Sequence, residues 1–250
     1  MTGPDGGRRD TAAAQAGTRS PESARRAPAP RAAERRAPTG PTALLVIAKE
    51  PLPGRAKTRL APALGAEAAA ELAAAALADT LDTVLAAPAR RRVLVLSGEP
   101  GPWLPERGFE VVAQASGGLD ERLAAAFAAC TGPTLLIGMD TPQATPSLLA
   151  PALAGDAWQD ADAWFGPAED GGFWALGMAR PDPRLLRGVP MSTERTGAIQ
   201  RDRLVRAGLR VRDLPPLVDA DTPEAAARVA RAAPGGRFAA VWQRSCAGGA

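Results

Sequence analysis

Short apolar runs alternate with longer amphipathic stretches along most of the chain. Residues 66–87 are rich in Ala and Leu with acids on one side, which predicts a long amphipathic helix. Such alternation is typical of βαβ units and predicts an α/β fold with a mainly parallel sheet. In the first half, four runs have the length and composition of buried strands: 43–48, 92–97, 109–113 and 133–138.

The second half of the chain has a less regular pattern. Residues 161–166 and 172–178 predict two strands on either side of a Gly-rich turn. Thr145-Pro146 and Asp221-Thr-Pro223 are typical helix starts, because a polar cap precedes a proline in the first turn. The remaining expected elements are helices at 119–130, 146–154, 194–207 and 223–232 and a strand at 209–213.

Composition divides the chain into one folded domain and two tails. Residues 1–41 contain no Ile, Leu, Val, Phe or Trp and are rich in Arg, Ala and Pro, which predicts a disordered tail. This tail holds eight arginines against four acids, a net charge of +4, so of the chain's +3 the folded part carries about −1, which indicates no nucleic-acid partner for it. We expect the domain at 42–237 and a C-terminal tail at 238–250.

The amino acids that the chain lacks restrict its chemistry. It contains no histidine and no tyrosine, which excludes Ser-His-Asp triads and histidine-bound zinc. Carboxylates and other oxygen donors remain, and these favour hard cations such as Mg²⁺ or Mn²⁺. Cys130 and Cys246 have neither metal-ligand spacing nor the number of a disulfide framework. With no apolar stretch long enough to span a bilayer and no secretory signal, we expect a cytoplasmic protein.

Two lysines and two arginines gather in one loop directly after the first predicted strand. Lys49 and Lys57 are the only lysines among 30 basic residues, and Arg55 and Arg59 lie beside them. A compact ammonium group suits phosphate, and a basic loop with Gly and Pro between a strand and a helix is a common phosphate site. The segment lacks the spacing of an NTPase P-loop. A phosphate-binding loop and a solvated basic loop are both consistent with it.

Two further loops carry isolated acids. Asp140 follows the predicted strand at 133–138, where one carboxylate and substrate phosphates commonly hold Mg²⁺. Its structural alternative is an Asx turn or a helix cap. In the loop at 219–223, Asp221 is a candidate helix cap, which leaves Asp219 as a candidate second metal ligand.

A Gly-rich turn at 166–173 carries two more acids. Glu169 and Asp170 stand beside Gly171 and Gly172, whose lack of side chains lets a ligand approach the backbone. Turns between strands have the same composition for purely structural reasons, so both interpretations stand. In a sugar transfer, Glu169 or Asp170 is a candidate base toward an acceptor hydroxyl.

These four loops, in this order, resemble those of the GT-A nucleotide-binding superfamily. More narrowly, they are similar to a bacterial family associated with radical-SAM and selenodomain gene clusters, usually labelled glycosyltransferase and related to 2-phospho-L-lactate guanylyltransferase and, more distantly, to molybdenum cofactor guanylyltransferase. The resemblance covers roughly 43–232 and implies a three-layer α/β/α domain with a mainly parallel mixed sheet. The motifs are Ala-Lys-x-Pro-x-Pro-Gly-x-x-Lys-Thr-Arg-Leu (48–60), Gly-x-Asp-x-Pro (138–142), Gly-Pro-Ala-x-Asp-Gly-Gly (166–172) and Asp-x-Asp-Thr-Pro (219–223).

The resemblance also implies roles for individual residues. Lys49, Lys57 and Arg59 would contact the nucleotide's phosphates, and we add Arg55 from the same loop. Asp140 would hold the metal together with Asp219 or Asp221, while Asp170, Gly171 and Gly172 would face the acceptor or sugar. Candidate catalytic residues are therefore Lys57, Asp140, Glu169 and Asp170.

Two segments depart from the family's pattern. The family tends to have Gly-Asp-Leu-Gly-Glu-Arg where this chain has Gly117-Gly-Leu-Asp-Glu-Arg122, which leaves the role of Asp120 open. It tends to have Trp-Ser-Thr where this chain has Met191, Ser192 and Thr193. We expect Ser192 and Thr193 to bind substrate, with an acceptor preference altered by the methionine.

Three functions are consistent with these residues. A glycosyltransferase would break the sugar–phosphate bond of a nucleotide sugar, and the family label slightly favours it. A nucleotidyltransferase would instead release pyrophosphate from an NTP, which suits the several cations of the first loop. The third function is nucleotide binding without catalysis. Either transferase would act on a small-molecule acceptor whose identity, like the oligomeric state, the residues leave open.

Overall fold

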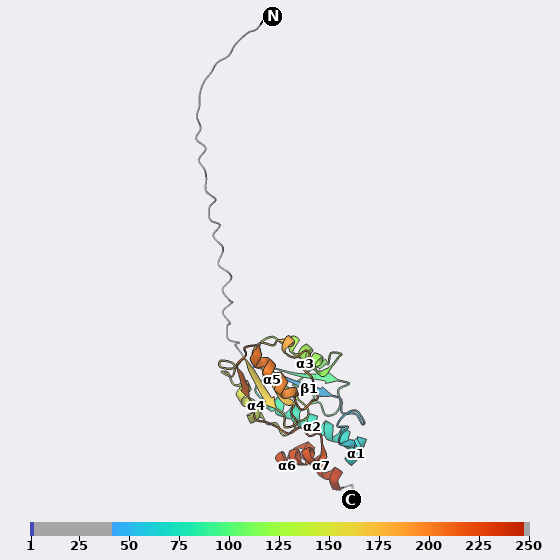
Figure 1. Ribbon diagram of the computed structural model, residues 1–250. Helices are drawn as coiled ribbons and strands as arrows, with labels where there is room; N and C mark the ends of the chain where they lie inside the picture. The colour runs from blue at the N-terminus through green and yellow to red at the C-terminus, as the bar shows by residue number, and fades with distance from the viewer. Residues whose placement is uncertain (3–41, 248–250) are drawn as a thin grey trace. The chain divides into compact units, whose positions relative to one another are not determined.

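The apolar runs form one seven-stranded sheet in the computed structural model, which describes residues 1–2 and 42–247 (Figure 1). The strand order is β3-β2-β1-β4-β6-β5-β7. Only β6 runs antiparallel to its neighbours among the pairings of these described strands, which confirms the expected mainly parallel mixed sheet. The strands are β1 (Ala43–Lys49), β2 (Arg91–Ser97), β3 (Glu110–Ala113), β4 (Thr134–Gly138), β5 (Ala163–Pro167), β6 (Phe173–Met178) and β7 (Val211–Asp213).

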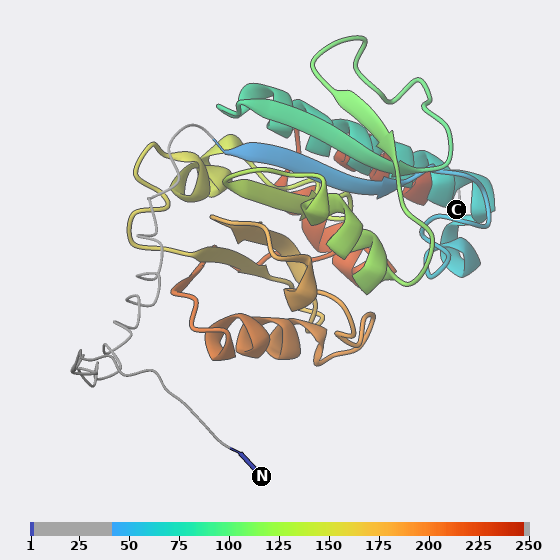
Figure 2. The ribbon, with the colours of Figure 1, turned by 90° about the horizontal axis from the view of Figure 1, so that it is seen from above.

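The central strands are apolar on both sides because helices cover both faces of the sheet (Figure 2). Alternate residues of β1 enter different clusters: Leu44 and Val46 pack with α2 and α4, whereas Ala43 and Leu45 pack with α3 and α5. The helices are α1 (Ala61–Leu64), α2 (Ala66–Ala86), α3 (Leu119–Ala128), α4 (Pro146–Leu153), the 3₁₀ helix η1 (Pro183–Leu185), α5 (Thr196–Arg206), α6 (Pro223–Ala232) and α7 (Arg237–Ala247).

Most boundaries lie within three residues of those predicted, and the two expected helix starts are explained by threonine caps. The hydroxyl of Thr145 accepts from the N–H of Leu148 at the start of α4, and that of Thr222 accepts from Ala225 at the start of α6. None of the helices in the described part of the chain is long and apolar enough to cross a membrane.

The end of the chain differs from the expected arrangement. The prediction of a C-terminal tail at 238–250 is wrong for residues 238–247, which form most of α7, while 248–250 lie outside the described residues. Helix α7 packs on α2 and α6 through Phe238 and Val241, which stand three residues apart on one helical face. About three turns of helix are too short to give a clear period in a single sequence. The expected tail at 1–41 lies outside the described residues apart from its first two.

Phe238 tests whether α7 belongs to the core. It is 1% exposed, and its N–H donates to Asp79 Oδ2 at 2.9 Å. We expect Phe238→Ala to lower the free energy of unfolding by about 3–5 kcal/mol, because it removes a buried ring and leaves a cavity. Urea unfolding measures this loss. Exposed Gln243 on the same helix is the control, and its alanine variant should change stability by less than about 0.5 kcal/mol. A loss below about 1 kcal/mol for Phe238→Ala would contradict the packing of α7.

Candidate functional site

The sheet brings three distant loops to one edge. Ile47 of β1 pairs with Gly138 of β4, so Lys49 and Asp140 leave the sheet at the same end of these parallel strands. Because β6 is antiparallel to β4, the Gly-rich turn that precedes Phe173 comes to this edge as well. In α/β proteins this carboxyl edge is the usual place for a ligand.

Hydrogen bonds fix a fourth loop beside these three. The N–H of Ala220 donates to the carbonyl of Asp140 at 3.0 Å. The side-chain amide of buried Gln143 donates to the carbonyl of Val218 at 2.7 Å. Residues 217–221 are therefore held against the end of β4, with Asp219 and Asp221 on either side of Ala220.

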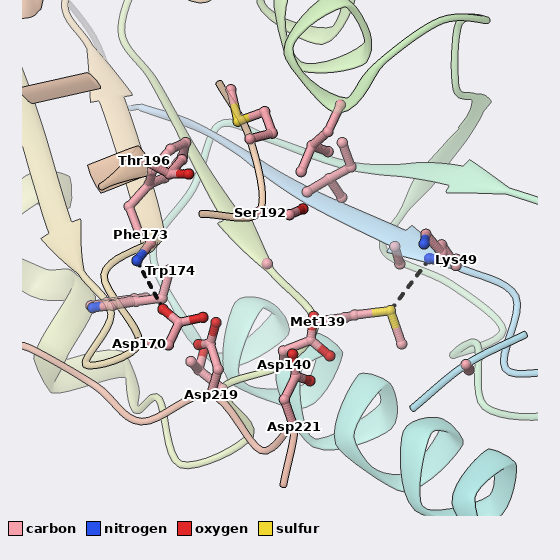
Figure 3. A pocket seen from close by; sticks show the side chains of 18 of the residues that line it. Lys49, Met139, Asp140, Asp170, Phe173, Trp174, Ser192, Thr196, Asp219 and Asp221 are labelled. Carbon is pink, nitrogen blue, oxygen red and sulfur yellow. Dashed lines mark hydrogen bonds between the residues drawn. The ribbon is translucent and has the colours of Figure 1, made fainter. Parts of the chain in front are cut away.

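A cavity of about 870 Å³ opens where the four loops meet, a volume typical of small-molecule sites. Figure 3 shows Asp140 beside Asp221 and Asp170 beside Asp219, with Lys49 set apart from these acids. Of the thirteen predicted site residues, eleven line this space and two, Glu169 and Gly171, do not. The predicted residues that line the cavity are Lys49, Arg55, Lys57, Arg59, Asp140, Asp170, Gly172, Ser192, Thr193, Asp219 and Asp221.

The ammonium group of Lys57 stands between two carboxylates. It lies 2.5 Å from Asp140 Oδ1 and 2.9 Å from Asp221 Oδ1, and its side chain is 2% exposed. Burial works to lower the pKa of Lys57, but the two carboxylates outweigh it and raise that pKa above its usual value. Neither carboxylate is a helix cap, since Thr145 and Thr222 hold those positions. The capping alternative for Asp140 and Asp221 is therefore wrong.

Asp219 is the acid with the least favourable surroundings. Its Oδ1 is buried and has no hydrogen-bond partner in the described part of the structure. Burial, followed by repulsion from Asp140, Asp170 and Asp221, raises its pKa from 3.8 to about 7. An unsatisfied buried carboxyl oxygen at the wall of a cavity is a feature of a binding site rather than of a packed core.

The expected metal ligands do not form a metal site as they stand. Asp140, Asp219 and Asp221 supply the oxygen donors that Mg²⁺ and Mn²⁺ prefer, and the orphaned oxygen of Asp219 is available. Within residues 42–247, however, no three acidic or cysteine side chains are arranged to hold a metal ion. The point at which Asp140 and Asp221 converge holds the ammonium group of Lys57 instead.

The two acids of the Gly-rich turn have different environments. Asp170 lines the cavity, is exposed, and accepts from the N–H of Gly172 at 2.8 Å. Glu169 is not among the lining residues and instead pairs with Arg228 of α6 at 2.9 Å. Glu169 is thus placed as a surface ion-pair partner, which leaves Asp170 as the candidate base. A Cβ on Gly171 (φ +89°) would collide with the carbonyl of Glu194, so this glycine lets two loops meet closely.

Ser192 has an unusual backbone conformation beside this turn. Its φ of 59° lies in the left-handed region, as does that of Lys57 at 48°, and residues with side chains rarely adopt it. Such conformations are frequent at ligand sites. Thr193 lines the cavity too, but its hydroxyl and N–H bond to Thr196 Oγ1 at the start of α5. Ser192 is therefore the freer of the two expected substrate contacts.

Two polar residues of the cavity have no place in the sequence-based expectations. Gln114 donates to the carbonyls of Ala48 and Val95 at 2.6 and 3.1 Å and accepts from Arg122 Nη1 at 3.0 Å. Both line the cavity. The segment that ends at Arg122 departs from the family's pattern at Gly118 and Asp120, and Asp120 accepts from the N–H of Gly188 at 2.7 Å. That hydrogen bond lowers the pKa of Asp120. It also links the start of α3 to the segment after η1.

The raised pKa of Asp219 predicts a pH-dependent stability. Between pH 3.8 and about 7 the folded protein retains a proton that the unfolded chain has released, so stability falls as pH rises through this window. Asp219→Asn removes the free-energy cost of ionising this buried carboxyl. The substitution should therefore raise the free energy of unfolding by about 2–3 kcal/mol more at pH 8 than at pH 5. Urea unfolding at both pH values measures it. Asp160→Asn, at a side chain that is 79% exposed, should show no such difference. An equal effect of Asp219→Asn at both pH values would contradict the assignment.

Part of the chain matches a known family. Residues 71–193 match the model of a family described as "Uncharacterized protein conserved in bacteria (DUF2064)". The matched segment includes Asp140 and Asp170 but neither Lys57 nor Asp221. No curated protein matches the sequence.

Three solved structures align with most of the chain. A protein of Desulfovibrio desulfuricans G20, described as a candidate nucleotide-diphospho-sugar transferase, is 27% identical with a TM-score of 0.71, over 82% of this chain and 95% of that one. The inositol-1-phosphate CTP transferase of T. maritima is 13% identical with a TM-score of 0.50, over 79% and 98%. Rv0371C of Mycobacterium tuberculosis H37Rv in complex with manganese is 22% identical with a TM-score of 0.46, over 76% and 98%. The chain has the fold of nucleotide-diphospho-sugar transferase-like proteins, and the narrower resemblance to guanylyltransferase-related families stays a prediction.

Proposed function

We propose that this protein is a transferase with a nucleotide-activated donor, and that it transfers a sugar from a nucleoside diphosphate sugar to a small-molecule acceptor. The observation that carries the proposal is one cavity, at the carboxyl edge of the sheet, that combines a basic loop with a cluster of carboxylates. The likeness to the Desulfovibrio desulfuricans G20 protein, which is described as a candidate transferase of nucleotide-diphospho sugars, supports the same conclusion.

The basic loop supplies the donor side of the reaction. Lys49 is exposed at the end of β1, and its N–H donates to the sulfur of Met139 at 3.3 Å, which fixes the start of the loop. Arg55 and Arg59 line the same cavity. In a sugar transfer, negative charge develops on the diphosphate as the sugar–phosphate bond breaks, and cations placed beforehand stabilise it. Lys49, Arg55 and Arg59 are the groups that we assign to this task.

The Gly-rich turn supplies the acceptor side. The carboxylate of Asp170 is exposed to the cavity and held by the N–H of Gly172, so it is positioned to accept a proton from an acceptor hydroxyl. Ser192 lines the cavity with its backbone in the left-handed region, which supports a role in acceptor contact. Met191 gives this region a flexible apolar side chain instead of a flat aromatic wall.

The proposal includes a divalent cation, Mg²⁺ or Mn²⁺, because the cavity contains carboxylates that suit it. Asp140 and Asp221 carry the oxygen donors for such an ion, which would bring charge neutralisation to the donor phosphates. In the structure these donors hold Lys57 instead, so binding of an ion requires a change in that ion pair.

Nucleotidyl transfer is the second candidate. Four basic residues within Lys49–Arg59 suit a triphosphate, whose α–β bond would break to release pyrophosphate. A phosphate or carboxylate acceptor would then need no base, and Asp170 would have no proton to accept. Nucleotide binding without catalysis is the weakest of the three functions, because a binding protein has no need of the unsatisfied carboxyl of Asp219 beside three further acids.

A binding panel tests the function directly. The melting temperature of the full chain is measured with NTPs and with nucleotide sugars, each with and without Mg²⁺ or Mn²⁺. We expect a metal-dependent stabilisation by a nucleotide sugar of about 2.7 kcal/mol at a hundred times its dissociation constant. Product analysis by mass spectrometry then separates the reactions, since sugar transfer releases a nucleoside diphosphate. Pyrophosphate release would establish the second candidate, and a panel without any response would remove both.

Lys49 tests the assignment of the basic loop. We expect Lys49→Ala to weaken nucleotide binding by about 1.5–3 kcal/mol, the usual value of a hydrogen bond to a charged group. Isothermal titration calorimetry measures the affinity. Because Lys49 is exposed, the melting temperature without ligand should remain unchanged. Arg180→Ala, at an exposed arginine that does not line the cavity, is the charge-matched control. Equal nucleotide affinity of wild type and Lys49→Ala would exclude a phosphate contact at this position.

A further inference from the structure

The ammonium group of Lys57 occupies the position that a metal ion would need. It contacts Asp140 Oδ1 and Asp221 Oδ1 at 2.5 and 2.9 Å, and its own side chain is 2% exposed. The carboxylates around it are much more open, at 42% for Asp140 and 37% for Asp221. The lysine is thus enclosed on its own side, while its partners remain accessible from the cavity. A divalent cation bound by these two oxygens would replace the ammonium rather than join it.

We propose that Lys57 is an exchangeable internal cation. Its ammonium group would move from Asp140 and Asp221 to the phosphates of the donor, and a metal ion would take its place between the two carboxylates. This exchange would couple metal binding to nucleotide binding. The inference rests on the proposed nucleotide-using function and adds a coupling between the binding of its two ligands, metal and phosphate. It is based on one contrast: Asp140 and Asp221 were expected to bind a metal ion, but they bind the ammonium group of Lys57 instead.

Repulsion between the cations of the cavity predicts that a metal ion alone binds weakly. Without a nucleotide, an incoming cation would drive Lys57 out into a cavity that Lys49, Arg55 and Arg59 also line. Four like charges would then share one space, and their repulsion opposes metal entry. Phosphate oxygens remove this opposition because they provide Lys57 with a new anionic partner. Metal and phosphate therefore bind more tightly together than either does alone.

The local structure allows the side chain of Lys57 to change partners while its backbone stays in place. The backbone of Lys57 is in the left-handed region with φ 48°, and its carbonyl accepts from the N–H of Leu60 at 2.8 Å. Leu60 is itself fully buried, so this turn is fixed to the core. The flexible four-carbon stem of the lysine is then the part that moves. Ala56, also buried, anchors the turn on the other side.

Arg59 offers a matched control within the same loop. Its guanidinium lies 3.9 Å from Asp221 Oδ2, so it carries the same charge near the same carboxylate. It is 67% exposed, however, and does not occupy the point between Asp140 and Asp221. Repulsion by a solvent-screened charge would change metal binding only slightly at Arg59, whereas exchange at the carboxylate pair would change it strongly at Lys57.

The first experiment measures binding of Mn²⁺ alone to the full chain by electron paramagnetic resonance. Lys57→Met, which keeps a stem of similar length without charge, should bind Mn²⁺ at least tenfold more tightly than wild type. Arg59→Met should stay within threefold of wild type, and so should Lys57→Arg, which retains a cation. Melting curves establish that each variant is folded. Unchanged or weaker Mn²⁺ binding by folded Lys57→Met, or no Mn²⁺ binding by any variant, would overturn the proposal.

The second experiment observes wild type and needs no substitution at Lys57. Because the chain has two lysines, ¹⁵N-lysine labelling gives two ammonium signals, and Lys49→Ala assigns them. Mg²⁺ alone should leave the Lys57 signal in place, whereas Mg²⁺ with inorganic tripolyphosphate should move it. An unmoved Lys57 signal, in a sample whose melting temperature shows that tripolyphosphate is bound, overturns the exchange but leaves the proposed function intact. If the nucleotide panel also gives no response, both fall together.

Discussion

The contact of Lys57 with Asp140 and Asp221 joins three segments that are distant in the sequence, up to 164 residues apart. Each segment enters by a different route: a loop after β1, the end of β4, and the chain before α6. Such an ion pair contributes little net stability, because desolvation of the lysine offsets much of the attraction. Its importance lies in position, since it brings the basic loop and the acidic cluster into one cavity.

The sheet makes this junction possible through one reversed strand. β1 and β4 are parallel neighbours, so their carboxyl ends deliver Lys49 and Asp140 to one edge. Had β6 been parallel as well, the turn before Phe173 would lie at the opposite edge, far from Asp140. The antiparallel β6 therefore brings Asp170 to the cavity, and the parallel strands bring Lys49 and Asp140. Asp170 and Lys49 line one cavity only because the sheet is mixed.

Local patterns predicted those features that depend on local physics. Apolar runs predicted the central strands, and the ends of these strands predicted that Lys49 and Asp140 lie at one edge of the sheet. Both predictions depend on burial and strand direction, which short segments of sequence are enough to indicate. Choices between competing side chains could not be predicted in this way. Glu169 and Asp170 are adjacent and chemically alike, yet one pairs with Arg228 of a later helix and the other faces the cavity. Such a choice depends on which distant residue arrives nearby, and this also explains why Lys57 was expected at phosphates rather than at carboxylates.

The acidic cluster holds more negative charge than its surroundings neutralise. Burial and the repulsion of neighbouring carboxylates raise the pKa of Asp219 to about 7, and its buried Oδ1 lacks a partner among the described residues. A cluster needed only for folding would have its oxygens satisfied by N–H groups or arginines, as Asp79 is by Arg237 and the N–H of Phe238. The destabilising arrangement at Asp219 has no structural benefit in the described part of the chain. Local features that conflict with stability are typical of functional sites, so the unpartnered oxygen of Asp219 supports the proposal that a ligand completes this cavity.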